Sequence, residues 1–140
     1  MAKPVAFLVF GDDWDRKSFI QLVADLGGVP DAHSWDAILT RDGATIWIAV
    51  TPPLEPGQRS RNVDAYEEAL GSPPRHKVSL QLSSQGDSEW LAAEIVVAAA
   101  EKWNLVVEGF DGEVLTAAEF NKRVVKRKQD LFRARQPRQG

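Results

Sequence analysis

Three aspartates, Asp12, Asp13 and Asp15, follow the first apolar run of this 140-residue chain. Carboxylate oxygens are the ligands that hard divalent cations prefer, so one interpretation of the cluster is a metal-dependent hydrolase. The other interpretation is structural, because Asp12 or Asp13 is placed to cap the helix expected after them, and acids are favoured in a first helical turn. We expect the capping role and predict neither a metal nor a cofactor.

Other residue types that carry catalysis follow no recognisable pattern. His33 and His76 are far apart and lack metal-ligand spacing, and the chain has no cysteine, which excludes disulfides and thiolate chemistry. The sequence contains no nucleophile elbow, no phosphate-binding glycine loop and no dinucleotide fingerprint. We therefore expect a binding protein and not an enzyme.

Aromatic and charged residues are better candidates for contacts with a partner. Trp14 and Trp35 lie near the ends of expected elements, where aromatic anchors and pocket walls often occur. The proline-rich connection contributes Arg59, Arg61 and the chain's single tyrosine, Tyr66. The predicted partner-binding set is Asp12, Asp13, Trp14, Asp15, Trp35, Arg59, Arg61 and Tyr66.

Charge is distributed unevenly along the chain. The net charge is −3, yet residues 121–140 carry eight bases and one acid, and residues 1–120 carry nine bases and nineteen acids. An acidic body with a basic tail can bind basic protein surfaces, anionic partners or itself, or both parts can be simply solvated. The acidic body would repel a polyanion, so we do not expect nucleic acid as a partner.

The first half of the chain predicts a strand, a helix and a hairpin. Residues 5–10 form a short, β-rich apolar run, and Phe19, Leu22 and Leu26 recur at helical spacing within residues 14–26. Two further β-rich runs, at 35–39 and 45–50, flank the pair Asp42-Gly43, a strong hairpin signal.

The second half repeats this pattern. Residues 77–82 alternate as a half-buried strand, residues 88–103 are expected to be helical, and two short runs flank Asp111-Gly112. We therefore predict an α+β fold of two tandem βαββ units, at 1–50 and 77–116. They should form one mixed or antiparallel sheet with the helices on one face.

The remaining segments connect and close these units within one domain, predicted to span residues 1–135. Residues 51–76 form a proline-rich connecting loop in which residues 62–70 could add a short helix. A capping box at Thr116 and Glu119 opens an amphipathic C-terminal helix, predicted over 116–134. Residues 136–140 are expected to be frayed.

The helix at 88–103 is apolar around most of its circumference, with Glu94 and Glu101 forming a narrow polar strip. Such a helix must be covered on more than one side. The C-terminal helix of the same chain is one candidate cover, and a homodimer through residues 88–103 is the other.

The chain resembles the small α/β immunity proteins that bacteria encode beside polymorphic or contact-delivered toxins. The resemblance lies in its size, its lack of cysteine, its acidic body and the run from Ala99–Trp103 into Phe110–Thr116. It implies a bacterial antitoxin that neutralises a cognate toxin by occluding the toxin's active site. The acidic groups would then match a basic enzyme such as a nuclease.

The duplicated layout also resembles effector-binding and gyrase-inhibitor-like domains, which hold small molecules in a groove between two such units. This resemblance implies a carboxylate in an aromatic-lined groove, for which Glu108 or Asp36 with Trp35 or Trp47 are the candidates. We rank the immunity role first, small-molecule binding second and the hydrolase third.

The sequence also suggests a location. No stretch approaches the roughly 20 apolar residues of a membrane span, and the run at 5–10 is too short for a signal-peptide core. We expect a cytoplasmic protein with no membrane partner.

Overall fold

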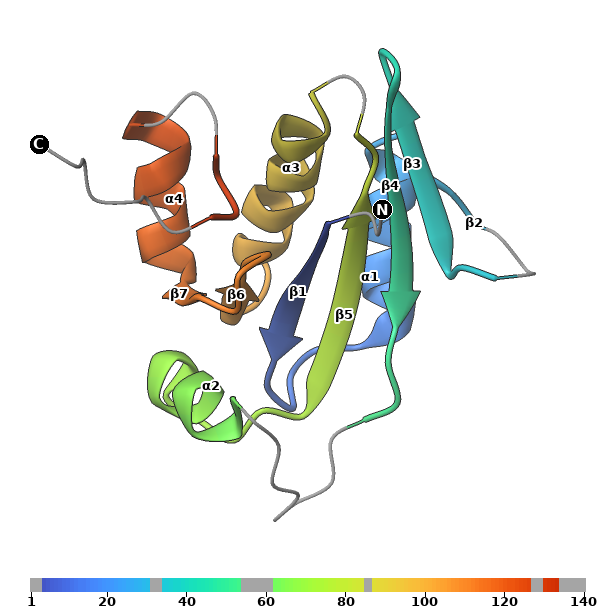
Figure 1. Cartoon of the computed structure of the whole chain (residues 1–140). Helices are drawn as coiled ribbons and strands as arrows, with labels where there is room; N and C mark the ends of the chain where they lie inside the picture. The colour runs from blue at the N-terminus through green and yellow to red at the C-terminus, as the bar shows by residue number, and fades with distance from the viewer. Residues whose placement is uncertain (1–3, 31–33, 54–61, 85–86, 127–129, 134–140) are drawn as a thin grey trace, which may run out of the picture.

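The computed structural model describes residues 4–30, 34–53, 62–84, 87–126 and 130–133. Within them the chain adopts an α+β fold with a seven-stranded antiparallel sheet and four helices (Figure 1). The elements are β1 (Val5–Phe10), α1 (Arg16–Asp25), β2 (Val29–Pro30), β3 (Ala37–Arg41), β4 (Ala44–Val50), α2 (Val63–Leu70), β5 (His76–Leu82), α3 (Ser88–Ala100), β6 (Leu105–Glu108), β7 (Val114–Thr116) and α4 (Ala117–Lys126).

The strand order, β2-β3-β4-β5-β1-β6-β7, interleaves the two halves of the chain. The two central strands are β1 and β5, which pair from Val5 opposite Gln81 to Phe10 opposite His76. The hairpin β3-β4 of the first half joins β5, and the hairpin β6-β7 of the second half joins β1. Since every pair is antiparallel, the mixed alternative for the sheet is wrong.

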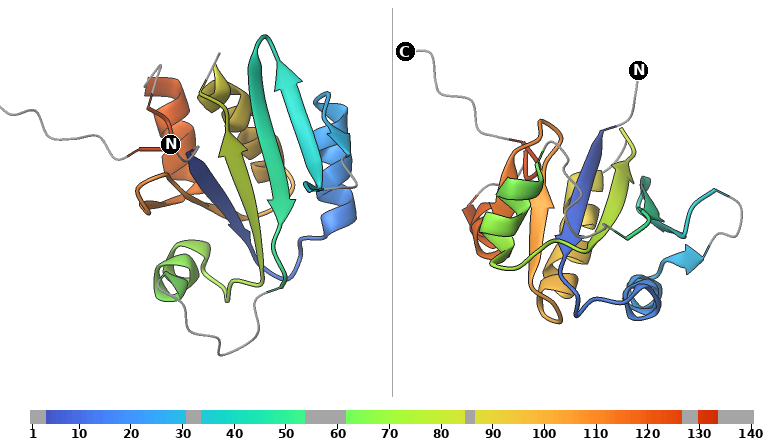
Figure 2. Two further views of the ribbon diagram at one scale, coloured as in Figure 1. Left: turned by 45° about the vertical axis from the view of Figure 1, so that its right-hand side comes forward. Right: turned by 90° about the horizontal axis from the view of Figure 1, so that it is seen from below.

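Alternation along the strands gives the sheet two different faces. In β5, Val78, Leu80 and Leu82 are buried against the main core, and the residues between them are half-buried on the other face. Helices α1, α3 and α4 contribute to the main core, whereas α2 contacts β6 and β7 from the opposite side (Figure 2). The prediction of helices on one face therefore fails at α2, which brings Tyr66 and Leu70 over strand residues whose side chains point away from the main core.

An aromatic cluster fills one end of the main core. Trp14 stacks on Phe10 with 5.1 Å between ring centroids, and Phe19 and Trp103 approach the same rings at 5.6 to 6.4 Å. Trp14 is only 4% exposed. A residue predicted to meet a partner therefore lies in the core, because the first turn after β1 folds its ring under the sheet.

The expected caps and turns are partly confirmed. Asp15, and not Asp12 or Asp13, caps α1, since its carboxylate accepts a hydrogen bond of 2.7 Å from the backbone N–H of Ser18. The capping box of α4 is present, with reciprocal bonds of 3.0 and 3.1 Å between Thr116 and Glu119. Asp42 and Gly43 both adopt positive φ, as a tight hairpin turn requires.

The C-terminal helix is shorter than predicted. Helix α4 ends at Lys126, and the chain at Asp130 has a φ of 58°, so residues 130–133 do not continue it. Leu131 and Phe132 are nevertheless fully buried, and Phe132 packs between Phe110 and Phe120. Periodicity suggested one long helix because these two apolar residues happen to fall in helical register with Phe120.

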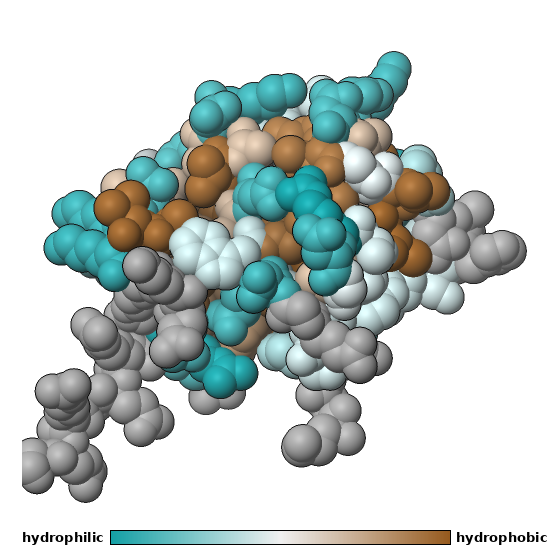
Figure 3. Space-filling model, turned by 90° about the horizontal axis from the view of Figure 1, so that it is seen from above, coloured by the Kyte–Doolittle hydropathy of each residue, from teal (hydrophilic) through white to brown (hydrophobic). Residues whose placement is uncertain are grey.

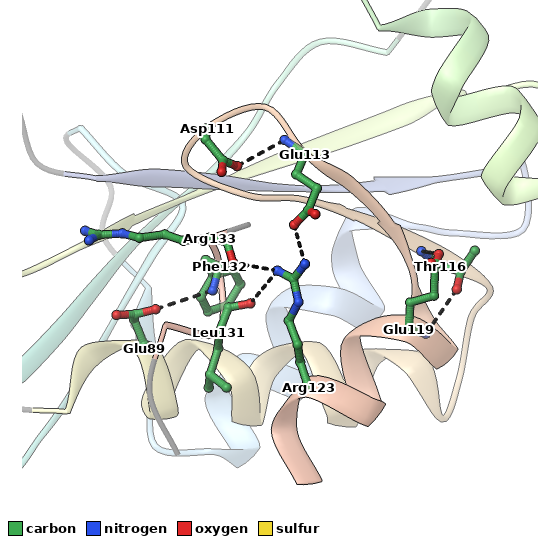
Figure 4. Close-up of polar contacts among 9 residues, drawn as sticks. All are labelled: Glu89, Asp111, Glu113, Thr116, Glu119, Arg123, Leu131, Phe132 and Arg133. Carbon is green, nitrogen blue, oxygen red and sulfur yellow. Dashed lines mark hydrogen bonds and ion pairs between the residues drawn. The ribbon is translucent and has the colours of Figure 1, made fainter. Parts of the chain in front are cut away.

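Arg123 holds residues 130–133, which we call the returning segment, in place (Figure 4). Its guanidinium donates to the carbonyl oxygens of Leu131 and Arg133, at 3.3 and 3.1 Å, and forms an ion pair with Glu113. The backbone N–H of Phe110 donates to the carbonyl of Phe132 at 2.8 Å. Arg123 therefore links α4 to this segment inside the molecule, although the sequence allowed the whole basic tail to be solvated.

The connection at 51–76 contains a helix, as expected for residues 62–70, because α2 covers Val63–Leu70. Residues 54–61, with Arg59 and Arg61, lie outside the described residues, as do the tail at 136–140 and residues 127–129. The short edge strand β2, which pairs with β3, was not predicted. Helix α3 ends at Ala100, three residues before the predicted end.

Among the described residues, the structure contains no helix with both the length and the apolar character needed to cross a membrane.

Gly109 provides a test of the returning segment. A Cβ added there would overlap the carbonyl oxygen of Phe132, which is fixed backbone. We expect Gly109→Ala to lower the free energy of unfolding by about 1–3 kcal/mol, measured by urea denaturation. The matched control is Gly11→Ala, whose Cβ would meet two side-chain oxygens, that of Ser72 at 3.3 Å and one of Asp13 at 3.7 Å, and no backbone atom within 4 Å. Equal stability of the two variants would contradict this packing.

Candidate functional site

The face of the sheet opposite the main core is the most distinctive surface of the molecule. Strand pairing aligns its side chains in rows, one running from Ala49 through Ser79 and Phe7 to Glu108. The next row passes from Lys77 through Val9 to Val106. Helix α2 covers only one end of this face, and the two ends therefore differ in chemistry.

Under α2 lies a small second core that contains a polar network. Val9, Tyr66, Leu70 and Val106 are buried together. Within this core the carboxylate of Glu108 accepts hydrogen bonds from the Tyr66 hydroxyl and, at 2.8 Å, from the Asn62 side chain. These bonds join α2 directly to β6.

Lys77 completes the network from β5. Its ammonium donates to the Tyr66 oxygen at 3.0 Å and lies 3.7 Å from a Glu108 carboxylate oxygen. The same ammonium sits over the Phe7 ring, 4.3 Å from the centroid. Removing a charge pair from water costs desolvation energy, which hydrogen bonds to both charges can offset. Here Lys77 and Glu108 each have several partners.

Burial, reinforced by the hydrogen bond and the charge of Glu108, raises the pKa of Tyr66. The phenol therefore stays protonated at neutral pH and donates to Glu108. Since each of the two carboxylate oxygens already accepts a hydrogen bond, the network is suited to fixing α2 on the sheet.

Beyond α2 the same face is uncharged. We call it the open sheet face and define it by half-buried side chains from β1, β3, β4 and β5. Among the described residues that project from this side of the seven strands, the charged ones are Lys77 and Glu108, both at α2. The members of the open sheet face are Val5, Phe7, Ile38, Thr45, Trp47, Ala49, Ser79 and Gln81.

Acidic side chains border this face at the end where α2 lies. Asp64, Glu67 and Glu68 line a groove of about 580 Å³ together with Gly71, Ser72 and Pro73. The turn after β1 reaches the same place, since Gly11 lies next to Ser72, and Arg75 pairs with Asp12 at 3.7 Å. We call the exposed acids of the two segments the acidic rim; they are Asp12, Asp13, Asp64, Glu67 and Glu68.

The opposite end of the molecule, seen from above in Figure 3, has a different surface. Hydrophobic residues emerge there in separate patches, divided by hydrophilic side chains.

The structure brings together only part of the predicted site. Asp12 and Asp13 are exposed in the acidic rim, Asp15 is used as a helix cap, and Tyr66 turns inward from α2. Trp35 is half-buried before β3, which three strands separate from β6.

The residues suggested for an effector groove are also dispersed. Asp36 accepts a hydrogen bond from Arg16 and one of 2.7 Å from the backbone of Val50. Partial burial acts to raise the pKa of Asp36, but these bonds and the Arg16 charge outweigh it and lower that pKa. Trp47 lies on β4, separated from Glu108 on β6 by two strands.

Sequence reasoning missed Lys77 and Asn62. The available signal was a lone lysine on the polar side of an otherwise apolar alternating strand, with a lone glutamate at the end of a later strand. The described residues contain no group of three or more histidine, cysteine, aspartate or glutamate side chains arranged to hold a metal ion.

Comparisons of the chain with models of protein families, with curated proteins and with solved structures found no match.

The hydroxyl of Tyr66 can be tested by its removal. We expect Tyr66→Phe to lower the free energy of unfolding by about 1–3 kcal/mol, because Glu108 and Lys77 each lose a hydrogen bond where water is excluded. Amide exchange in α2 should accelerate more than exchange in α3. Ser79→Ala, which removes a hydroxyl from the open part of the same face, should have a much smaller effect. If both variants are as stable as the wild type, the hydroxyl does not hold α2.

Tyr66 is the chain's single tyrosine, so its ionisation is spectroscopically isolated. Its pKa is raised on folding, so the unfolded chain releases the phenolic proton first and stability falls as pH rises above about 10. Phenolate absorbance should appear only together with alkaline unfolding, and Tyr66→Phe should lessen the loss of stability between pH 9 and 12. A tyrosine that titrates near pH 10 in the folded protein would contradict the buried network.

Proposed function

We propose that this protein is a protein-binding module that recognises a basic partner through its open sheet face and acidic rim. One observation carries the proposal: an uncharged, partly aromatic sheet face is bordered at one end by five exposed acids. Interface cores in general are depleted of charge and enriched in aromatic residues, while their borders are polar. Acids at such a border attract a basic partner and accelerate its association.

The specific role that we propose is that of a cytoplasmic bacterial immunity protein, an antitoxin that occludes the active site of a cognate toxin. An enzyme that acts on a polyanion, such as a nuclease, carries a basic active-site surface that matches the acidic rim. A broad sheet face suits steric occlusion, which needs contact area and no catalytic group. The same acids disfavour nucleic acid itself as the ligand.

We also interpret the two halves of the chain as related units. The elements β1, α1, β3 and β4 follow the same order as β5, α3, β6 and β7. In this interpretation the pairing of β1 with β5 is the junction of two βαββ units, and the open sheet face is shared by both.

A second candidate function is the binding of a small molecule between these units. It is favoured by the position of Glu108, a buried carboxylate beside the rings of Phe7 and Tyr66. Lys77 already supplies a cation at this position, so a cationic ligand would have to displace it.

The partner can be sought by affinity capture from the host lysate, with washes at low and high salt. A captured toxin should inhibit growth when expressed alone and lose this effect when the present chain is co-expressed. If the captured protein is harmless, the immunity role fails. If no protein is captured and small molecules change the tryptophan fluorescence, the second candidate replaces the first.

Charge reversal tests the acidic rim with the purified pair. We expect Glu67→Lys with Glu68→Lys to slow association about tenfold at low salt and to weaken its salt dependence, because both steering charges are inverted. Surface plasmon resonance at several salt concentrations measures both quantities. The control is Asp25→Lys, an exposed acid at the end of α1, on the other side of the sheet. Equal effects of the two changes would refute docking at the rim.

A further inference from the structure

A groove on the helical side of the molecule is not used by the proposed function. It lies between the last turns of α3 and the first turns of α4 and has a volume of about 320 Å³. Three alanines leave it hollow, because their side chains are too short to fill the space between the two helices. Its lining residues are Val96, Val97, Ala100, Glu101, Ala117, Ala118, Phe120 and Asn121.

Apolar side chains continue from the groove onto the helix surfaces. Val97 is 36% exposed on α3, and Val125 is 78% exposed on α4, one turn after the groove residue Asn121. Valine is exposed this far on a helix at the cost of leaving apolar area in water. The groove therefore lies within a wider apolar surface formed by two helices.

The charges around this surface differ between the helices. On the exposed side of α3 that includes Val97, Glu94 already pairs with Arg41 of β3 at 2.5 Å, and Glu101 follows the last residue of the helix. On α4, Lys122 and Lys126 are exposed beside Val125. One helix of the pair thus presents acids and the other presents bases.

We propose that this surface binds a second copy of the same chain, with α3 of each copy lying over α4 of the other. A two-fold axis parallel to the helices places α3, with Glu101 at its end, over the lysines of the partner's α4, and does so twice. A two-fold axis across the helices would place α3 over α3 and bring acid against acid. Charge complementarity selects the first arrangement.

The size of the surface is small for a protein interface. A 13-residue helix beside a 10-residue helix offers a patch of roughly 20 by 20 Å, on the order of 400 Å² per copy. This is about half of a standard protein interface, so the dimer is weak and dissociates on dilution into the micromolar range.

The dimer is independent of the proposed partner site. Helices α3 and α4 pack on the main-core side of the sheet, and the open sheet face lies on the other side. Both surfaces can be occupied at once, and loss of one interaction leaves the other intact.

Sedimentation velocity over a range of concentrations tests the proposal. We expect a monomer–dimer equilibrium that weakens with added salt, and a dissociation constant at least about tenfold higher for Val97→Asp. Val29→Asp is the matched control, because Val29 is 63% exposed on β2, away from both helices. Far-UV circular dichroism and thermal melting verify that each variant is folded.

A charge exchange distinguishes this geometry from other dimers. Glu101→Lys and Lys122→Glu should each weaken the dimer, and the two changes combined in one chain should restore it, since opposite charges face each other again. A monomer at all accessible concentrations would overturn the proposal. So would a dimer that is insensitive to Val97→Asp, or an equal loss with Val29→Asp.

Discussion

The antiparallel pairing of β1 with β5 joins the two halves of the chain, because the hairpin of each half lies beyond the central strand of the other. The partners are about 70 residues apart, so the pairing must repay a large loss of chain entropy. Its register also decides which side chains share a face. If β1 shifted by one residue against β5, Leu8 would turn out of the main core and Phe7 would enter it, while Leu80 of β5 kept its place.

Much of this fold could be predicted from local patterns. Alternation in residues 77–82 specifies which side chains of β5 are buried, and the Asp-Gly pairs locate both hairpins. The sequence-based predictions were wrong where one local pattern was compatible with more than one structure. Asp12, Asp13 and Asp15 are all plausible caps, and only the position of Ser18 N–H selects Asp15. Leu131 and Phe132 satisfy helical periodicity, yet the chain turns back at Asp130 and buries them from another direction.

The candidate site was less accessible to sequence reasoning, because its parts come from distant segments. Tyr66, Lys77 and Glu108 belong to three different elements, and only the order β5-β1-β6 brings the last two within reach of each other. The acidic rim likewise combines the turn after β1 with α2. Composition gives the sign of the charge in advance, but the topology determines where that charge gathers.

The returning segment also bears on the order of folding. The seven strands of the described residues all precede Leu131 and Phe132, so the sheet can form while the space between Phe110 and Phe120 is still empty. In any state of the chain in which Phe132 is not yet docked, that space is an exposed aromatic slot, a surface prone to aggregation. Arg123 is synthesised before this segment, and its guanidinium is ready to bind the carbonyl oxygens of Leu131 and Arg133 when they arrive. The main core is therefore complete only after Leu131 and Phe132 have docked.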